Sequence, residues 1–209
     1  MLGLKGRIEV WKNRYLVCKV KDKNGKSVRK RIYDDRCGRR NRNTLEYTRY
    51  EVMKKEEKTN VMRVLDGKKI SYESHSYEPD ATMSGKEIAG ILGEDSKKVF
   101  KTLVTQGKSG AYYVFVVPVD DELNLKKAAK ISGEKAISMI KQKELLPLTG
   151  YVHGGCSPIG MKKQFPTFIH ETAIGFDKVF VSAGKVGYQI ELSPENLISV
   201  AGCTVADII

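Results

Sequence analysis

The glycine-rich run Gly154-Gly155-Cys156-Ser157-Pro158-Ile159-Gly160 is the part of the sequence best suited to hold a ligand through its backbone. Glycine has no Cβ, so its amide group can approach a carbonyl or phosphate oxygen closely and donate a hydrogen bond to it. We predict that Tyr151-Val152, directly before this run, is a strand. Clusters of glycine and proline also form plain turns, so a turn without a ligand stays the alternative.

Other residue patterns that mark enzyme centres are missing. The sequence contains no G-x-S-x-G, G-x-x-x-x-G-K-[ST] or G-x-G-x-x-G motif. Its four cysteines form no C-x-x-C pair, and no two of its three histidines stand four residues apart. We therefore expect no disulfide framework, no metal site and no cofactor. Cys156 lies near His153, but no motif ties the two together, so a cysteine nucleophile is not favoured.

The positive charge is concentrated at one end of the chain. The 209 residues carry a net charge of +12. Residues 1–52 hold sixteen Lys or Arg against six Asp or Glu, so they account for +10. The rest of the chain carries only +2. This contrast divides the sequence into a basic segment and a nearly neutral domain.

We predict that residues 1–52 form a basic extension. Strands over residues 7–20 and 28–33, joined through Asn24-Gly25, would make a hairpin, and residues 34–49 have the polar composition of a loop or disordered segment. Two interpretations stay open. The extension is either an arm that binds tRNA or DNA through phosphate contacts, or an addition without function, with Met53 as the true start of the protein.

The remaining residues, 53–209, have the pattern of a mixed α+β domain. We predict helices over residues 61–67, 84–93, 125–131 and 134–143 and after Ser193-Pro194, and strands over residues 70–77, 99–105, 111–119, 178–182 and 188–192. No run of the sequence reaches the roughly 18 apolar residues of a membrane helix, and the first residues lack the apolar core of a secretory signal. We therefore expect a cytoplasmic protein with no membrane partner.

Four short motifs follow one another in this domain: Phe100-Lys101-Thr102-Leu103, Leu125-Lys126-Lys127-Ala128-Ala129, residues 150–160, and Val181-Ser182-Ala183-Gly184-Lys185. In composition, order and spacing they resemble the YbaK family of Cys-tRNA(Pro) deacylases. The resemblance covers residues 59–209. Residues 1–52 have no counterpart in that family.

The resemblance implies a fold and an activity. The fold would be a mixed, curled β-sheet surrounded by helices, similar to the editing domain of bacterial prolyl-tRNA synthetase, and that synthetase is a candidate partner. The substrate would be mischarged Cys-tRNA(Pro), with Cys-tRNA(Cys) as a further candidate. The thiol of the cysteinyl group would attack its own ester, so the protein would need no nucleophile, metal or cofactor. Two alternatives stay open: water-mediated deacylation of Ala-tRNA(Pro), and a non-catalytic module that binds a nucleotide or tRNA.

The resemblance also implies the site residues. Lys101 matches the signature lysine of the family and would contact the tRNA end, while the amides of Gly154 and Gly155 would bind the ester carbonyl. Tyr77 and Ser182 match residues that line the family's pocket. Gln189 stands where some members carry Asp, which leaves its direct role open.

Overall fold

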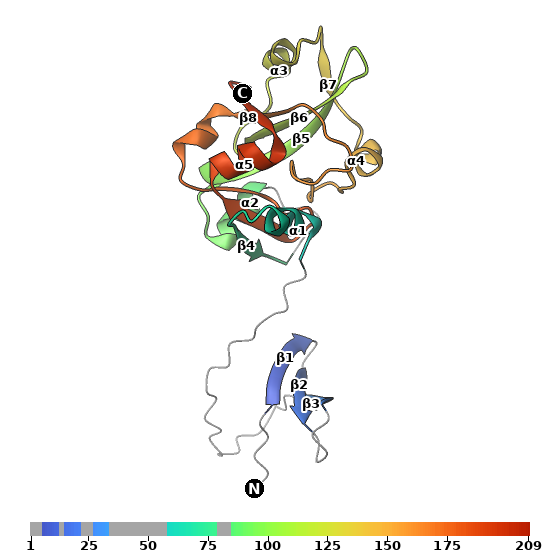
Figure 1. The fold of residues 1–209 in the computed structure, drawn as a ribbon, viewed down its shortest axis with the longest axis vertical. Coiled ribbons are helices and arrows are strands. Elements are labelled where there is room, and N and C mark those ends of the chain that lie inside the picture. Colours follow the sequence, from blue (N-terminus) through green and yellow to red (C-terminus); the bar gives the residue numbers. More distant parts are fainter. Residues whose placement is uncertain (1–5, 13–14, 22–26, 34–57, 79–84) are drawn as a thin grey trace. The chain divides into compact units, whose positions relative to one another are not determined.

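The computed structural model describes residues 6–12, 15–21, 27–33, 58–78 and 85–209. The chain divides into two compact units, Met1–Glu57 and Lys58–Ile209 (Figure 1). Each unit is considered by itself. None of the described helices is long and apolar enough to cross a membrane.

The first unit contains a three-stranded antiparallel sheet. Its strands are β1 (Gly6–Lys12), β2 (Tyr15–Lys21) and β3 (Ser27–Tyr33), in the order β1-β2-β3. The single strand expected over residues 7–20 is wrong, because this stretch forms two strands that pair with each other. The expected turn at Asn24-Gly25 and the expected loop over residues 34–49 lie outside the described residues.

The second unit contains two sheets and five α-helices in its described part. In chain order the elements are α1 (Asn60–Gly67), β4 (Glu73–Ser76), α2 (Gly85–Leu92), the short 3-10 helix η1 (Ser96–Lys98), β5 (Phe100–Gly107), β6 (Tyr112–Pro118), α3 (Leu125–Ser132), β7 (Ile137–Met139), α4 (Gln142–Thr149), β8 (Thr167–His170), η2 (Glu171–Gly175), β9 (Val179–Ser182), β10 (Tyr188–Leu192), α5 (Pro194–Ala201) and β11 (Cys203–Ala206).

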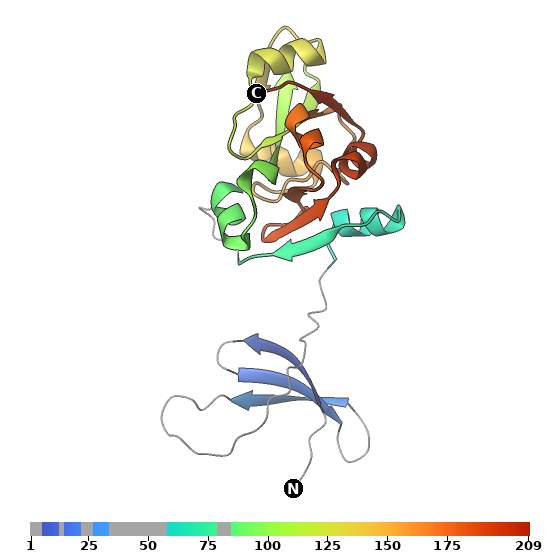
Figure 2. The same cartoon turned by 90° about the vertical axis from the view of Figure 1, so that its left-hand side faces the viewer.

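The larger sheet is mixed. Its strand order is β11-β8-β6-β5-β7, with antiparallel pairing on both sides of β5 and parallel pairing between β6, β8 and β11. The smaller sheet is antiparallel, in the order β4-β10-β9. Figure 2 shows the helices placed around these strands. The expected α+β fold with a mixed sheet and surrounding helices is confirmed.

Strand β6 lies between two apolar layers. Val114 and Val116 belong to the main core, whereas Phe115 and Val117 pack in a second cluster on the opposite face of the sheet. All four side chains are fully buried. Successive residues of a strand point to opposite faces, so an uninterrupted apolar run is what a strand covered on both sides requires.

Several local predictions hold and two are wrong. Helices α1, α2, α3 and α5 lie where the pattern placed them, and Ser193 caps α5 by accepting a hydrogen bond from the amide of Asn196. The helix expected over residues 134–143 is wrong: residues 137–139 pair with the end of β5 as β7, and α4 begins only at Gln142. The expected strand Tyr151-Val152 is also wrong. The Tyr151 hydroxyl instead donates to the carbonyl of Ile159, 2.7 Å away, across the loop that follows.

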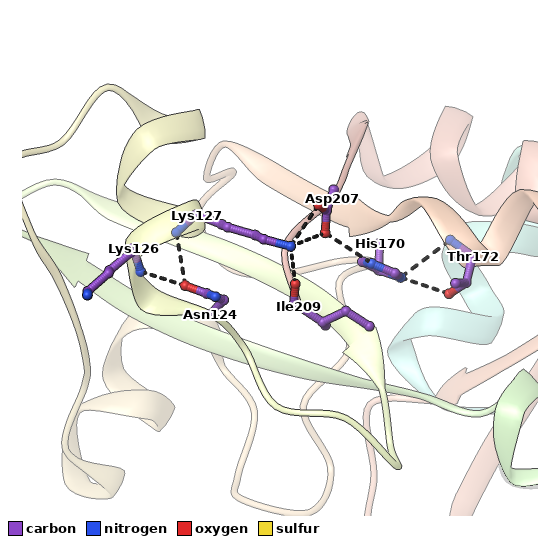
Figure 3. A network of polar contacts seen from close by, with 7 residues as sticks. All are labelled: Asn124, Lys126, Lys127, His170, Thr172, Asp207 and Ile209. Carbon is purple, nitrogen blue, oxygen red and sulfur yellow. Dashed lines mark hydrogen bonds and ion pairs between the residues drawn. The ribbon is translucent and has the colours of Figure 1, made fainter.

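Polar contacts fix the C-terminal end of the chain (Figure 3). The Nζ of Lys127 in α3 donates to both carboxylate oxygens of Asp207, at 2.8 and 2.7 Å, and to the carbonyl of Ile209. His170, at the end of β8, lies with its Nε2 3.7 Å from the same carboxylate. One carboxylate therefore ties the residues after β11 to both a helix and a neighbouring strand.

We expect Asn124→Ala to destabilise the second unit. The Oδ1 of Asn124 accepts hydrogen bonds from the amides of Lys126 and Lys127 and so satisfies two donors that the first turn of α3 leaves open. Loss of such a cap costs about 1 kcal/mol, or a fall in Tm of roughly 2 to 4 °C for a unit of this size. Thermal unfolding followed by circular dichroism measures it. Asn124→Asp, which keeps the acceptor, is the control, and an equal fall in both variants would contradict the capping role.

Candidate active site

A cavity of about 460 Å³ lies between β5 of the larger sheet and the smaller sheet. It brings together five of the six residues that the sequence singled out: Tyr77, Lys101, Gly154, Ser182 and Gln189. Gly155 does not line it. Apolar side chains form most of the remaining wall, among them Ile88, Phe100, Leu103, Val119 and Leu145. The site therefore combines a few polar groups with a largely apolar surround, as small-molecule sites commonly do.

Lys101 brings a cation to the cavity. It is the second residue of β5 and pairs with Val117 of β6. Its Nζ donates to the carbonyl of Val119 over 3.4 Å, and no carboxylate of the described residues lies within ion-pair distance of it. An ammonium group has three donors. Lys101 therefore keeps donors available for an incoming hydroxyl, carbonyl or phosphate oxygen.

The two glycines of the loop differ in what their amides do. Gly154 lines the cavity with a φ of +76°, a backbone conformation that favours glycine. Gly155 is buried, and its amide donates to the carbonyl of Val152 over 3.0 Å. A Cβ on Gly155 would come within 2.9 Å of the amide nitrogen of Val186, so the chain can pass there only with glycine. Gly155 thus lets the loop pack closely, while Gly154 faces the ligand space.

Strands β9 and β10 supply two polar side chains that lie opposite each other. Ser182 and Gln189 are register partners. The Ser182 hydroxyl accepts from the amide of Gly184 over 3.3 Å, which leaves its own proton free to be donated. Gln189 is only 6% exposed, and its Oε1 has no hydrogen-bond partner among the described residues.

Thr102 is a candidate site residue that the sequence analysis did not single out. Its Oγ1 is buried without a described partner, and the residue lines the cavity. It stands between Phe100 and Val104, two core residues on the same face of β5, where an apolar residue would be expected. Buried polar atoms are rarely left unpaired. An orphaned hydroxyl at a cavity wall is therefore the signal that marks Thr102, and that signal exists only in the folded chain.

Tyr77 closes the cavity at the end of β4. Its amide donates to the carbonyl of Gly187 over 3.0 Å, which holds the backbone against the loop before β10. Partial burial raises the pKa of its hydroxyl above the usual value, and the nearby Glu94 carboxylate adds to this. The hydroxyl therefore stays protonated and can donate a hydrogen bond into the cavity.

Cys156 lines the cavity but is poorly suited to act as a nucleophile. Burial raises the pKa of its thiol to about 12, and the thiolate is the reactive form of cysteine. Neighbouring His153 is exposed, and the described residues show no hydrogen bond between the two side chains. A catalytic Cys-His pair is therefore not supported.

A charged cluster lies on the small sheet. The His75 ring is placed between two carboxylates, with Nε2 3.1 Å from Glu191 and Nδ1 3.9 Å from Glu94. The ligand atoms of Glu73, His75 and Glu191 lie within 4.8 Å of one another, close enough to share a cation. Lys178 already provides one, with its Nζ 2.5 Å from Glu73 and 3.6 Å from Glu191. These groups were not anticipated from the sequence, because they are spread over residues 73–191.

Comparison with known proteins gives a consistent picture. Residues 78–200 match the model of a family described as "Aminoacyl-tRNA editing domain". The chain is 44% identical over 156 residues to the Enterococcus faecalis protein named "Putative Cys-tRNA(Pro)/Cys-tRNA(Cys) deacylase EbsC", covering 74% of this chain and 95% of that protein. It is 26% identical over 99 residues to the proline–tRNA ligase of Fervidobacterium nodosum, which is 47% of this chain and 17% of the ligase.

A solved structure resembles this chain over most of its length. It is described as that of a "putative trans-editing enzyme for prolyl tRNA synthetase", is 26% identical in sequence and superimposes with a TM-score of 0.63. The match covers 71% of this chain and 94% of the other. The family match begins at residue 78 and so leaves residues 1–57 uncovered, in keeping with their separation as a unit of their own.

We expect Glu94→Gln to raise stability at alkaline pH. Burial, reinforced by the nearby Glu191, raises the pKa of the Glu94 carboxyl from 4.5 to about 7, and its side chain is only 4% exposed. A carboxyl whose pKa is higher in the folded state stabilises the fold in its protonated form, and this contribution is lost as the pH rises from about 4.5 to about 7. At pH 8 the Gln variant, which carries no charge, should gain on the order of 1 to 2 kcal/mol.

Thermal melts of both proteins at pH 5 and pH 8 test this expectation. Glu122→Gln, a substitution at an exposed carboxylate, is the control for a general effect of removing one negative charge. A gain of the same size at pH 5 and pH 8 would show that Glu94 is not titrating as described.

Proposed function

This chain belongs to the aminoacyl-tRNA editing domain family, and we propose that it is a trans-acting deacylase that removes cysteine from mischarged tRNA, in the first place Cys-tRNA(Pro). The resemblance to YbaK proteins seen in the sequence is thereby confirmed. Such an activity is needed because a synthetase that binds proline cannot fully exclude cysteine. Cysteine and proline are close in size, and an apolar pocket separates side chains that differ by one methylene by only about 1 to 3 kcal/mol.

The cavity supports this proposal because its polar groups match the parts of an aminoacyl ester. The orphaned oxygens of Gln189 and Thr102 are acceptors, and the α-ammonium group of a cysteinyl ester is a donor that would satisfy them. Lys101 would bind the terminal ribose or a phosphate, and the amide of Gly154 would donate to the ester carbonyl. Gly155 would act by holding the loop in place.

The reaction we propose uses the substrate's own thiol. The cysteinyl sulfur attacks the ester carbonyl carbon, a C–S bond forms, and the bond to the ribose oxygen breaks. The thiol proton ends on that oxygen, so the products are a free 3′-terminal hydroxyl and a cyclic thiolactone. The protein then contributes orientation of the reacting groups and donors for the developing oxyanion. Tyr77 and Ser182 keep hydroxyl protons for that role.

One observation carries the proposal: the cavity gathers Lys101, Gly154, Ser182 and Gln189 from four separate segments, and the cysteine among its described lining residues, Cys156, is buried, which raises the pKa of its thiol to about 12. A site with binding groups, in which the cysteine is poorly suited to act as a nucleophile, fits catalysis assisted by the substrate. A prolyl-tRNA synthetase could serve as a docking partner that presents the tRNA, and such docking stays a proposal.

We expect the purified chain to release cysteine from Cys-tRNA(Pro), and Lys101→Ala to lose at least about 100-fold in kcat/KM, because several kcal/mol of transition-state contact would be removed. Lys101→Arg should recover part of the rate. Ala-tRNA(Pro) and Pro-tRNA(Pro) are the control substrates. Faster loss of alanine than of cysteine would favour a water-mediated Ala-tRNA(Pro) deacylase. No release from any substrate, with or without synthetase, would favour a binding module.

We expect alkylation of the cysteinyl thiol in Cys-tRNA(Pro) to abolish its deacylation, because the attacking atom is then blocked. Cys156→Ala should keep the rate on the free-thiol substrate within a fewfold, because the buried thiol takes no part. Release of the amino acid is followed on both substrates with both proteins. Turnover of the blocked substrate at an unchanged rate would rule out attack by the substrate thiol, and a loss of 100-fold or more in Cys156→Ala would instead give the protein its own nucleophile.

A further inference from the structure

The proposed activity leaves most of the positive charge of the chain unused. Residues 1–52 carry +10, whereas the rest of the chain, which contains the cavity, carries +2. A tRNA is a polyanion, and neutralising its phosphates with Lys and Arg provides much of the affinity in nucleic-acid binding. The basic residues of the first unit are therefore the ones whose placement needs an explanation.

Residues of β1, β2 and β3 that pair directly across the sheet form a row, and the strand register defines these rows. Alternate rows belong to opposite faces of a sheet. One face holds the rows Lys12–Tyr15–Tyr33, Val10–Val17–Arg31, Arg7–Lys19–Arg29 and Lys21–Ser27. The other face holds the rows Trp11–Leu16–Ile32, Ile8–Cys18–Lys30 and Gly6–Val20–Val28.

The two faces differ sharply in charge. The first, here called the basic face, contains six Lys or Arg, two Tyr and no acidic residue. The second contains one Lys, and its other members are apolar residues and Gly6. The separation gives the sheet one side suited to a polyanion.

An irregularity in β1 produces this separation. Strict alternation from Arg7 would place Glu9 and Trp11 on the same face as Arg7. The register instead shifts between Ile8 and Val10, which leaves Glu9 as the extra residue of a β-bulge. As a result Trp11 joins Ile8 in the apolar rows and Lys12 joins Arg7 on the basic face. The pattern of the β1 sequence alone does not reveal this exchange.

We propose that the basic face of sheet β1-β2-β3 binds the phosphate backbone of the tRNA substrate. This inference rests on the proposed function, because it is the editing unit in the same chain that makes tRNA the relevant nucleic acid. The basic face takes Lys and Arg residues from three adjacent strands whose backbones lie about 4.8 Å apart, so its positive residues extend over the sheet in two directions. Tyr15 and Tyr33, which are direct cross-strand partners, add aromatic rings of the kind on which unpaired bases stack.

The test compares two triple variants of the full chain that change the net charge equally. Lys19→Gln/Arg29→Gln/Arg31→Gln removes cations from the basic face, and Lys30→Gln/Lys68→Gln/Lys130→Gln removes one from the opposite face and two exposed ones from the editing unit. Binding of uncharged tRNA(Pro) is measured by fluorescence anisotropy over a range of salt concentrations. The basic-face variant should bind about tenfold or more weakly, and the slope of log K against log salt should fall by about 2 to 3. The control should stay within about twofold of wild type.

Circular dichroism is used to check that each variant is folded. The single variants Arg31→Gln and Lys30→Gln, neighbours in β3 on opposite faces of the sheet, repeat the binding comparison with one substitution each. Turnover of 3′-O-cysteinyl-adenosine, an ester without a tRNA body, should be equal in all the proteins. If wild type cleaves neither this ester nor Cys-tRNA(Pro), the proposed activity is wrong. The comparison of tRNA binding still tests the role of the sheet in that case. Equal tRNA binding by both triple variants, or tighter binding of a duplex DNA than of tRNA by wild type, would overturn the inference.

Discussion

The packing of the small sheet against strand β5 is the contact on which the candidate site depends. Phe100 and Val104 of β5 share one buried cluster with Val181 of β9 and Ile190 of β10, and a parallel bridge joins Val99 to Phe180. The cavity lies beside this contact, with Lys101 and Thr102 on one wall and Ser182 and Gln189 on the other. If the two sheets separated, the polar groups would keep their strands but would no longer surround a common space.

The same packing explains why the site can bind and orient a substrate without strongly reactive side chains. Burial raises the pKa of the Cys156 thiol and of the Tyr77 hydroxyl, so both keep their protons. The polar atoms left without partners, on Thr102 and Gln189, are held in fixed positions by strands. Preorganised donors and acceptors of this kind act on a transition state without having to reorganise, which is the contribution that a substrate-assisted reaction requires.

The charged residues of the editing unit nearly balance, whereas the first unit carries a large positive excess. Beside the candidate site, the Glu191 carboxylate lies 3.1 Å from the His75 ring and 3.6 Å from the Nζ of Lys178, whereas the Glu94 oxygens are buried without a hydrogen-bond partner among the described residues. On strand β5, Lys101 is a cation with no described acidic partner. The excess of positive charge lies in the first unit. In the function proposed here, recognition of the aminoacyl group and attraction of a polyanion are assigned to separate sets of residues.

The sequence alone predicted the class of the fold and most of the residues that meet in the candidate site. The apolar run of β6, the caps of α5, and the motifs around Lys101, Gly154 and Ser182 are local patterns, and they led to the right elements and to five residues of one cavity. The pattern of residues 134–143 predicts a helix because short apolar runs do not distinguish helix from strand, and only pairing with β5 makes residues 137–139 the strand β7.

The tertiary structure decided what depends on neighbours that are distant in the chain. Thr102 is identified as a candidate site residue only by its hydroxyl, which is buried without a partner among the described residues. Gly155 is identified as a packing residue because its amide donates to Val152 and a Cβ at this position would meet the backbone of Val186. The bulge at Glu9 assigned the residues of β1 to their faces. Burial, hydrogen-bond partners and strand register are properties of pairs of segments, so no single stretch of sequence contains them.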